Sequence, residues 1–437
     1  MRLWHYNMSV QIITSEGVQT LSEKILSRAS SRDRVRPGEI VTCRVDLAMM
    51  HDSGGPRRVA ARLASLGAKV WDPDKIVLAS DHFVPAVDIE SAEILALTRR
   101  WAHAEGVKNF YDQEGICHVV IQEHGHLRPG MFAVGGDSHS TSGGAFGAFM
   151  VGIGATEMTG VLATGEIWIK VPETIRLVWQ GRFGSAVSAK DIMLFLCARL
   201  GMNNNYKAFE YAGSAVEAMP MPERMVLCNM AAELGGKAGI VEPDQTTLAA
   251  LEAAGVDPES NALNWKSDLD AHYARTHEFD ASALEPQVAA PHSPANSTAV
   301  GEHLDTALDL AYIGACTGAK LTDLHMAAAA LKGRKVASGM RLLIAPASTR
   351  TTAAAAADGT LAILTEAGAK ILPSGCGACA GMGAGTLAAG EVCISSTARN
   401  FKGRMGSPEA QVYLGSPYTV AASAVRGKIT DPREFVA

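Results

Sequence analysis

The sequence predicts an α/β protein whose sheets are built mainly from parallel strands. Two observations predict this class. Short apolar, β-branched runs alternate with Ala- and Leu-rich segments of helical length, and polar residues of ligand-binding types directly follow several of the apolar runs. Repeated strand–helix units favour parallel pairing, with all carboxyl ends at one edge of the sheet. The predicted strands are residues 76–80, 131–134, 310–314, 341–345, 369–372 and 392–395.

Helices are predicted between these strands. Residues 322–332, 352–357 and 361–367 have helical composition, and the first and last of these segments are followed by a glycine, a common helix terminator. Residues 256–303 are rich in Pro, Asn, Ser and Asp and are interpreted as an irregular connection between domains. We therefore expect three α/β subdomains, covering residues 8–199, 200–305 and 306–437.

Composition argues against nucleic-acid binding and membrane insertion. The 437 residues are 47% apolar and 19% charged, which is typical of a globular protein with more than one domain. The 39 basic and 45 acidic residues give a net charge of −6, so no basic surface for a phosphate backbone is expected. The longest apolar-looking stretch, residues 145–162, contains four glycines and Glu157, and is not expected to span a membrane.

The first residues and the cysteine count indicate a cytoplasmic protein. The segment MRLWHYNMSV lacks the apolar core of a secretory signal, and eight cysteines are few for this length. We therefore expect reduced thiols and no disulfide framework. We also expect translation to begin at Met8, with the seven preceding residues as an extension.

Chemically active side chains follow five of the predicted strands. Open parallel sheets bind ligands in the crevice outside the carboxyl ends of their strands. The coincidence of five such positions predicts a single site assembled from distant parts of the chain. The residues are Asp81 and His82; Asp137, Ser138 and His139; Cys316; Cys376 and Cys379; and Ser395, Ser396 and Arg399.

Three of the cysteines could share one metal centre. Cys376 and Cys379 form a CxxC motif between glycines, and Cys316 lies 60 residues before Cys376. An iron–sulfur cluster with one open iron position would suit this set. The alternatives are a redox dithiol, half of a structural zinc site, and cysteines that are simply buried. Core packing is expected for the other five cysteines, at positions 43, 117, 197, 228 and 393.

Two Asp–His pairs are candidates for general acid chemistry. A carboxylate beside an imidazole can fix its tautomer and keep it protonated, as Asp81 could for His82 and Asp137 for His139. A helix N-cap with a nearby histidine is the structural alternative. The role of a third pair, His51 and Asp52, is less clear from the sequence. His124 and His126 precede a strand and are expected to be structural.

Arg399 and Arg404 lie in the segment SSTARNFKGRMG. A guanidinium group can bind a carboxylate with two parallel hydrogen bonds. Such a segment is usually a solvated loop, but beside a metal site it would suit a substrate with several carboxylates.

Several motifs together resemble the aconitase superfamily, and most of all the large subunits of isopropylmalate dehydratases. The motifs run in the family's order from about residue 18 to the end of the chain. They are DHFVPA, GGDSHS, LEPQVAAPHSP, a GxCT segment followed 60 residues later by CGAC, and SSTARNFKGRMG.

The resemblance implies a [4Fe–4S] cluster bound by Cys316, Cys376 and Cys379, with one iron free for the substrate. It implies reversible dehydration of a small hydroxy di- or tricarboxylate, followed by rehydration at the neighbouring carbon. It implies that His82, oriented by Asp81, donates a proton to the leaving hydroxyl. Asp137 and His139 would bind water and substrate, and Glu233, with Asn229 beside it, would place a carboxylate near the cluster water. Ser138, Arg399 and Arg404 would bind the substrate.

The resemblance also implies a partner. Full-length aconitases carry a C-terminal swivelling domain with the catalytic serine base, and no such segment follows in this chain. We therefore expect a separately encoded small subunit, a heterodimer, and no activity from this chain alone.

The chain departs from the family pattern in two motifs. The family's usual GSCTNG is GACTGA here, and an alanine replaces the usual Asn before Arg399. These departures put the potential of the cluster and the identity of the substrate in question. The departing residues are Ala315, Gly318, Ala319 and Ala398.

These observations predict the cluster-binding subunit of a hydro-lyase for isopropylmalate-type acids in leucine biosynthesis. Alternatives of the same class would act on homoaconitate, dimethylmalate or citramalate. Alternatives of other classes are a non-catalytic, cluster-sensing RNA-binding protein, which the acidic net charge disfavours, and a zinc-dependent hydrolase, which would be colourless.

Overall fold

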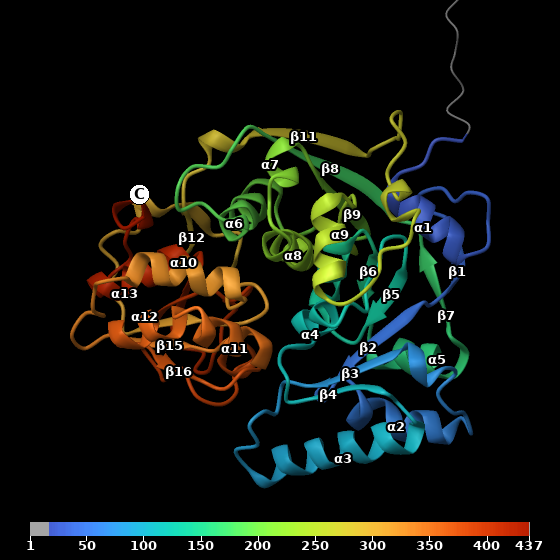
Figure 1. The fold of residues 1–437 in the computed structure, drawn as a ribbon, viewed down its shortest axis with the longest axis horizontal. Coiled ribbons are helices and arrows are strands. Elements are labelled where there is room, and N and C mark those ends of the chain that lie inside the picture. Colours follow the sequence, from blue (N-terminus) through green and yellow to red (C-terminus); the bar gives the residue numbers. More distant parts are fainter. Residues whose placement is uncertain (1–16, 437) are drawn as a thin grey trace, which may run out of the picture.

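The computed structural model describes residues 17–436 (Figure 1). Residues 1–16 and 437, and with them the expected start at Met8, lie outside the described part. Three sheets of four or more strands organise the chain in sequence order, and a small antiparallel pair joins β1 (Ile40–Arg44) to β7 (Glu166–Lys170). Within residues 17–436, no helix combines the length and the apolar character needed to cross a bilayer.

The first sheet is entirely parallel and has the strand order β4-β3-β2-β5-β6. Every residue of β2 and β3 is buried, as expected for parallel strands that are covered on both faces. Figure 1 shows α2 and α3 on one side of this sheet, with α4 on the other. The elements are β2 (Leu47–His51), β3 (Ile76–Ser80), β4 (Asn109–Asp112), β5 (Phe132–Gly135), β6 (Phe149–Gly152), α1 (Leu21–Ala29), α2 (Pro56–Ser65), α3 (Ile89–Glu105), α4 (Cys117–Glu123) and α5 (Ala155–Thr164).

The second sheet is also parallel, with the order β10-β9-β8-β11. Its apolar face packs against α6 and α8 in a core that continues into the first sheet. The elements are β8 (Glu173–Gln180), β9 (Lys207–Ala212), β10 (Ala238–Val241), β11 (Arg275–Asp280), α6 (Ala189–Leu200), α7 (Ser214–Glu217), α8 (Met221–Asn229) and α9 (Gln245–Ala253).

The third sheet has seven strands in the order β13-β12-β18-β17-β14-β15-β16, parallel from β18 to β16. Strands β12 and β13 are joined antiparallel at one edge. Helices pack on one face, and the segment that carries Cys376 and Cys379 lies on the other. The elements are β12 (Gln287–Ala289), β13 (Ser297–Ala299), β14 (Leu310–Ile313), β15 (Arg341–Ile344), β16 (Lys370–Ile371), β17 (Val392–Ser395), β18 (Gln411–Leu414), α10 (Leu321–Leu331), α11 (Thr349–Ala357), α12 (Thr360–Ala367) and α13 (Pro417–Arg426).

The predicted α/β class with parallel sheets is confirmed, and all six predicted strands exist with small shifts of their ends. Helix α11 begins earlier than predicted because the Ser348 side chain caps it by accepting the backbone N–H of Thr351. The stretch 256–303, interpreted as irregular, contains β11, β12 and β13. The sequence RTHEFD of β11 shows no apolar alternation because the strand lies exposed at the edge of its sheet.

The sheets do not follow the limits predicted for the three subdomains. The second sheet begins with β8 at Glu173, inside the range 8–199, and the third begins with β12 at Gln287, inside the range 200–305. The division into three subdomains stays a prediction.

Candidate active site

The site lies where the first and third sheets face each other at the carboxyl ends of their strands. Backbone hydrogen bonds join the two there, since Cys376 N donates to Asp81 O (2.8 Å) and Ile116 N donates to Ala347 O (2.9 Å). This contact brings residues almost 300 positions apart in the chain into one crevice. The predicted convergence of strand-end residues is therefore present for Asp81 and Cys376.

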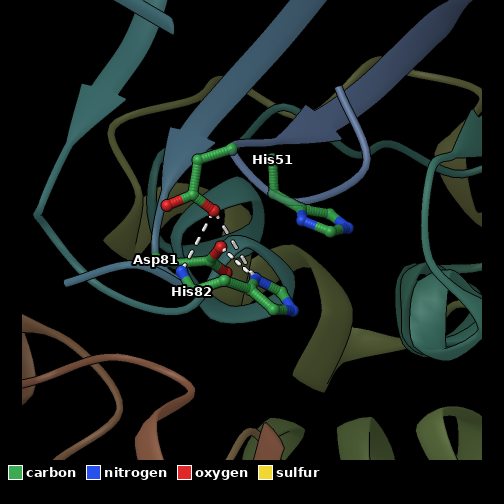
Figure 2. A group of neighbouring side chains, drawn as sticks. His51, Asp81 and His82 are labelled. Atoms are coloured by element: carbon green, nitrogen blue, oxygen red, sulfur yellow. Dashed lines mark hydrogen bonds and ion pairs between the residues drawn. The ribbon is translucent and has the colours of Figure 1, made fainter. Parts of the chain in front are cut away.

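An Asp–His pair occupies the end of β3 (Figure 2). His82 Nδ1 lies 2.6 Å from Asp81 Oδ1, and the other oxygen of Asp81 accepts the backbone N–H of Cys117 (2.7 Å). Asp52 fixes the loop after β3 by accepting hydrogen bonds from the backbone N–H groups of His82 (3.1 Å) and Phe83 (2.9 Å). The imidazole orientation is thus set by two carboxylates from neighbouring strands.

These carboxylates keep His82 charged. Burial disfavours the imidazolium form, but the negative charges of Asp81 and Asp52 outweigh burial and raise the pKa of His82 to about 9. Although burial acts against it, the same pairing lowers the pKa of Asp81. Because Nδ1 faces Asp81, the proton available for transfer sits on Nε2.

His51 and Asp52, the pair that the sequence left ambiguous, belong to this site. The His51 ring stacks on His82 with 4.1 Å between centroids and 16° between planes (Figure 2). Burial, followed by the positive charge of His82, lowers the pKa of His51 to about 4. One ring of the stack is therefore charged and the other neutral near pH 7.

A second network begins at the end of β5. Asp137 accepts the backbone N–H of His139 (2.8 Å) and pairs with His118 Nε2 (2.9 Å). His139 Nε2 in turn lies 2.9 Å from Glu233 Oε1. Burial opposes charge on His139, and so does Arg399, yet the hydrogen bonds to Asp137 and Glu233 raise its pKa.

Arg399 joins this network from the third sheet. Its Nε donates to Glu233 Oε1 (2.7 Å) and its Nη2 donates to Ser138 Oγ (2.9 Å). Arg404 lies on the same loop, and its buried Nε has no hydrogen-bond partner among the described residues. Guanidinium groups with donors left over can bind an incoming carboxylate.

The three candidate metal ligands are buried or half-buried free thiols. Burial, together with the neighbouring Cys379, raises the pKa of the Cys316 thiol to about 12. Asn229 Nδ2 opposes this by donating to Cys316 Sγ (3.2 Å). Burial also raises the pKa of Cys379, whose thiolate the charges of Arg404 and Arg399 favour. Thiolates here need a cationic centre to stabilise them.

The spacing of the sulfurs suits a metal centre larger than one ion. Zinc bound by several thiolates has Zn–S distances of about 2.3 Å, which places the sulfurs roughly 3.8 Å apart. Among the described residues, the clusters whose ligand atoms lie within 4.8 Å of one another contain His and Asp but no cysteine. The donor set therefore fits a multi-iron cluster better than a structural zinc ion.

Sequence reasoning missed two buried polar residues at this site. His118 lies in the otherwise apolar start of α4, and nothing near it in the sequence marks it as a partner of Asp137. Lys190 lies in the first turn of α6, and its Nζ reaches Thr317 Oγ1 (3.0 Å) and Thr397 O (2.9 Å). A lysine in the first turn of a helix whose middle is wholly apolar is the one signal that could have marked Lys190.

The remaining histidines and cysteines follow the structural interpretation. His124 and His126 stack around Tyr111, which is consistent with a structural role. The predicted burial of the other five cysteines is confirmed. They are Cys43, Cys117, Cys197, Cys228 and Cys393.

A cavity of about 230 Å³ opens beside His82 and Gly377, which lies within the CxxC motif. Most of its wall is apolar, and no Lys or Arg lines it. The lining residues are His82, Phe83, Val84, Pro85, Val87, Asp88, Ser91, Gly377, Met382 and Gly383.

Comparison with known proteins agrees with this geometry. The sequence profile of the Aconitase family (aconitate hydratase) matches residues 23–307 and 301–427. This chain belongs to the aconitase family, as the motifs predicted, and is an aconitase-type hydro-lyase. A solved structure, the holo-form of aconitase X from Thermococcus kodakaraensis, shares the fold with a TM-score of 0.50 at 14% identity, covering 84% of this chain and 88% of that one.

Curated relatives are similar over nearly their whole length. The 3-isopropylmalate dehydratase large subunit 1 of Methanopyrus kandleri is 46% identical, covering 96% of this chain and 100% of the relative. A probable methanogen homoaconitase large subunit of Methanothermobacter thermautotrophicus is 43% identical, covering 95% and 97%. The relatives are both named as large subunits, but their names state different enzymes.

Proposed function

We propose that this chain is the cluster-binding large subunit of a hydro-lyase that isomerises 2- and 3-isopropylmalate-type acids by dehydration and rehydration. The observation that carries the proposal is a half-buried histidine, His82, held protonated by Asp81 at the same crevice as the CxxC loop. The relatives named 3-isopropylmalate dehydratase large subunit support the substrate class.

The cofactor in this proposal is a [4Fe–4S] cluster bound by Cys316, Cys376 and Cys379. When bound, it supplies a Lewis acid that polarises the hydroxyl group of the substrate. The burial of the three thiols, their separation and the cationic groups around Cys379 support this assignment.

His82 is the proton donor for the leaving hydroxyl. Its Nε2 proton passes to the hydroxyl oxygen, which departs as water, while the neighbouring carbon loses a proton and the C=C bond forms. In the second half of the reaction water gives a proton to His82 and its hydroxyl adds to the neighbouring carbon, while the base returns its proton to the carbon that lost the hydroxyl. The net change is isomerisation. The base that takes the carbon-bound proton is assigned to the partner subunit.

The arginine loop binds the substrate carboxylates. Arg399 uses one N–H for Glu233 and one for Ser138, so three of its five donors stay free for a carboxylate. Asp137, His139 and Glu233 form a polar network joined to Arg399, and we assign them to binding of the substrate and the released water.

The cavity beside His82 supports an apolar side group on the substrate. Phe83, Val84 and Met382 would contact an isopropyl or methyl group. A carboxyethyl group, which homoaconitate carries in place of isopropyl, would find no lysine or arginine in this wall and would face the Asp88 carboxylate. This observation favours isopropylmalate-type acids over homoaconitate.

A separate small subunit and a role in leucine biosynthesis complete the proposal. Relatives named as large subunits, which this chain matches over nearly their full length, support such a partner. A cytoplasmic location, which suits a biosynthetic enzyme, is part of the same proposal.

The test is an anaerobic assay of the reconstituted chain with and without a candidate small subunit. Formation of the conjugated C=C bond is followed by ultraviolet absorbance, with 3-isopropylmalate, homocitrate, citramalate and dimethylmalate as substrates. Activity on 3-isopropylmalate that requires the small subunit supports the proposal. Activity of the chain alone contradicts the need for a partner, and a preference for homocitrate contradicts the apolar side group.

A further inference from the structure

Lys190 is a fully buried lysine that reaches the metal-binding region from another part of the fold. It lies in the first turn of α6, whose start is fixed by a capping box between Ser188 and Asp191. Its side chain is among the largest that are wholly buried. From there it reaches two loops at the carboxyl edge of the third sheet, one after β14 and one after β17.

The two loops meet at its ammonium group. Lys190 Nζ donates to Thr317 Oγ1 (3.0 Å) and to Thr397 O (2.9 Å). Thr317 follows Cys316, and its hydroxyl already donates to Ser396 O (3.1 Å), so it accepts from Lys190. Lys190 therefore links the loop of the first cysteine to the loop that carries Arg399.

Neither hydrogen-bond partner of Lys190 carries a charge. The nearby buried carboxylate of Asp323 is already paired with Lys320, at 2.6 Å. An ammonium group buried without an anion is strongly unfavourable, and burial lowers the pKa of Lys190 to about 8. Cys316 and Cys379 are near enough for the charge of their thiolates to act on Lys190.

The other donors at these loops are directed to backbone carbonyls, since Lys320 Nζ donates to Cys316 O (3.2 Å) and Ser396 Oγ donates to Gly314 O (3.2 Å). The side chains at positions 315, 318, 319 and 398 are methyl groups or hydrogens, and none of them can donate to sulfur or to a carbonyl. Of the side chains on and around these loops, Asn229 donates to Cys316 Sγ and Lys190 ties the loops together.

We infer that Lys190 is a positioning residue whose buried ammonium group provides the counter-charge for the thiolate ligands of the metal centre. The inference rests on the proposed function, because it requires that the cysteines bind a cluster as thiolates. It implies reciprocity: the ligands stabilise the charge on Lys190, and Lys190 stabilises the bound, anionic form of the ligands.

The inference predicts opposite effects of one substitution in the two states of the protein. Lys190→Met keeps the length and apolar stem of the side chain but removes the charge. In the cluster-free protein, where the buried thiols are neutral, it relieves an unbalanced charge and is expected to leave the Tm unchanged or higher. In the cluster-bound protein it removes the counter-charge, so the cluster becomes harder to reduce and is lost more readily. A side chain that only filled space would lower stability in both states.

The experiment compares wild type with Lys190→Met, Lys190→Gln and Lys190→Arg, each cluster-free and anaerobically reconstituted. The readouts are the reduction potential of the cluster, the rate of iron loss to a chelator and the Tm of the cluster-free chain. For Met and Gln we expect about tenfold weaker retention of the added electron, equivalent to a shift of roughly 59 mV to lower potential. Iron loss is expected to be about tenfold faster in these two variants. Lys190→Arg keeps the charge and is expected to keep the wild-type potential.

Three outcomes overturn the inference: wild-type potential and iron retention in both the Met and Gln variants, an equal shift in the Arg variant, or a lower Tm of the cluster-free Met variant. If the Met variant does not fold, the comparison of Gln with Arg still decides between charge and shape. A wild-type chain that binds no cluster would instead refute the proposed function, so the two failures are distinguishable.

Discussion

Replacing Asp81 by asparagine removes the negative charge that contributes most to keeping His82 protonated. Asp81 Oδ1 lies 2.6 Å from His82 Nδ1, and the variant keeps a similar shape and an oxygen that can still accept the Cys117 N–H. Burial then still lowers the pKa of His82, and only the charges of Asp52 and Asp137 remain to raise it. We expect the pKa of His82 to fall from about 9 toward its ordinary 6.5.

The size of the effect follows from these two values. At pH 8 a group with a pKa of about 9 is about 90% protonated, whereas one with a pKa of 6.5 is about 3% protonated. If His82 donates the proton, kcat of Asp81→Asn at pH 8 is expected to be about thirtyfold below wild type. Near pH 6 the two enzymes should differ much less.

The assay is kcat as a function of pH from 5.5 to 9.5, measured anaerobically with reconstituted protein and small subunit. Asp52→Asn is the matched control, because Asp52 lies farther from His82 Nδ1 (3.7 Å) and should move the profile less. Parallel pH profiles for wild type and Asp81→Asn, differing only by a constant factor, would refute the role of Asp81 in holding the proton.

Three further predictions concern stability and substrate binding. Gly318→Ala is expected to lower the free energy of unfolding in urea by about 1–3 kcal/mol, because a Cβ there would lie 2.1 Å from Ser396 Oγ. Gly160→Ala is the control: it lies in a helix with open space around it and should raise that free energy by about 0.5–1 kcal/mol. Arg399→Lys keeps the charge but loses the paired geometry for a carboxylate, so KM should rise about tenfold in steady-state assays, and an unchanged KM would remove Arg399 from substrate binding. Because the folded-state pKa of His82 is raised, its contribution to stability is complete below pH 6.5 and is lost as the pH rises through about 9. Between pH 6.5 and pH 9.5 the free energy of unfolding in urea should therefore fall more for wild type than for His82→Gln.

Local sequence patterns predicted what is local in this protein. The strand ends that carry Asp81, Asp137 and Cys316 could be located because apolar runs stop just before them, and parallel sheets gather such ends. The sequence predicted that Asp81 and the Cys376 loop share one crevice. It did not predict the backbone hydrogen bond from Cys376 N to Asp81 O, which only the folded structure shows.

Pairings across the fold could not be predicted in the same way. His118 and Lys190 lie in helices whose local pattern is that of ordinary amphipathic or apolar segments, and their partners are 19 and more than 100 positions away. Strand β11 was missed because its exposed position at a sheet edge leaves no alternation of apolar residues. In each case the information lies in tertiary packing and is absent from the neighbouring sequence.

The central claim is that Cys316, Cys376 and Cys379 hold an iron–sulfur cluster in a hydro-lyase site. The most direct measurement is anaerobic purification followed by iron, sulfide and zinc analysis and an absorbance spectrum, for wild type, Cys376→Ser and the buried control Cys393→Ser. We expect a brown protein with about four irons and four sulfides per chain in wild type and in the control, with the cluster lost or depleted in Cys376→Ser. A colourless wild-type protein that carries zinc, or a cluster that survives intact in Cys376→Ser, would contradict the assignment.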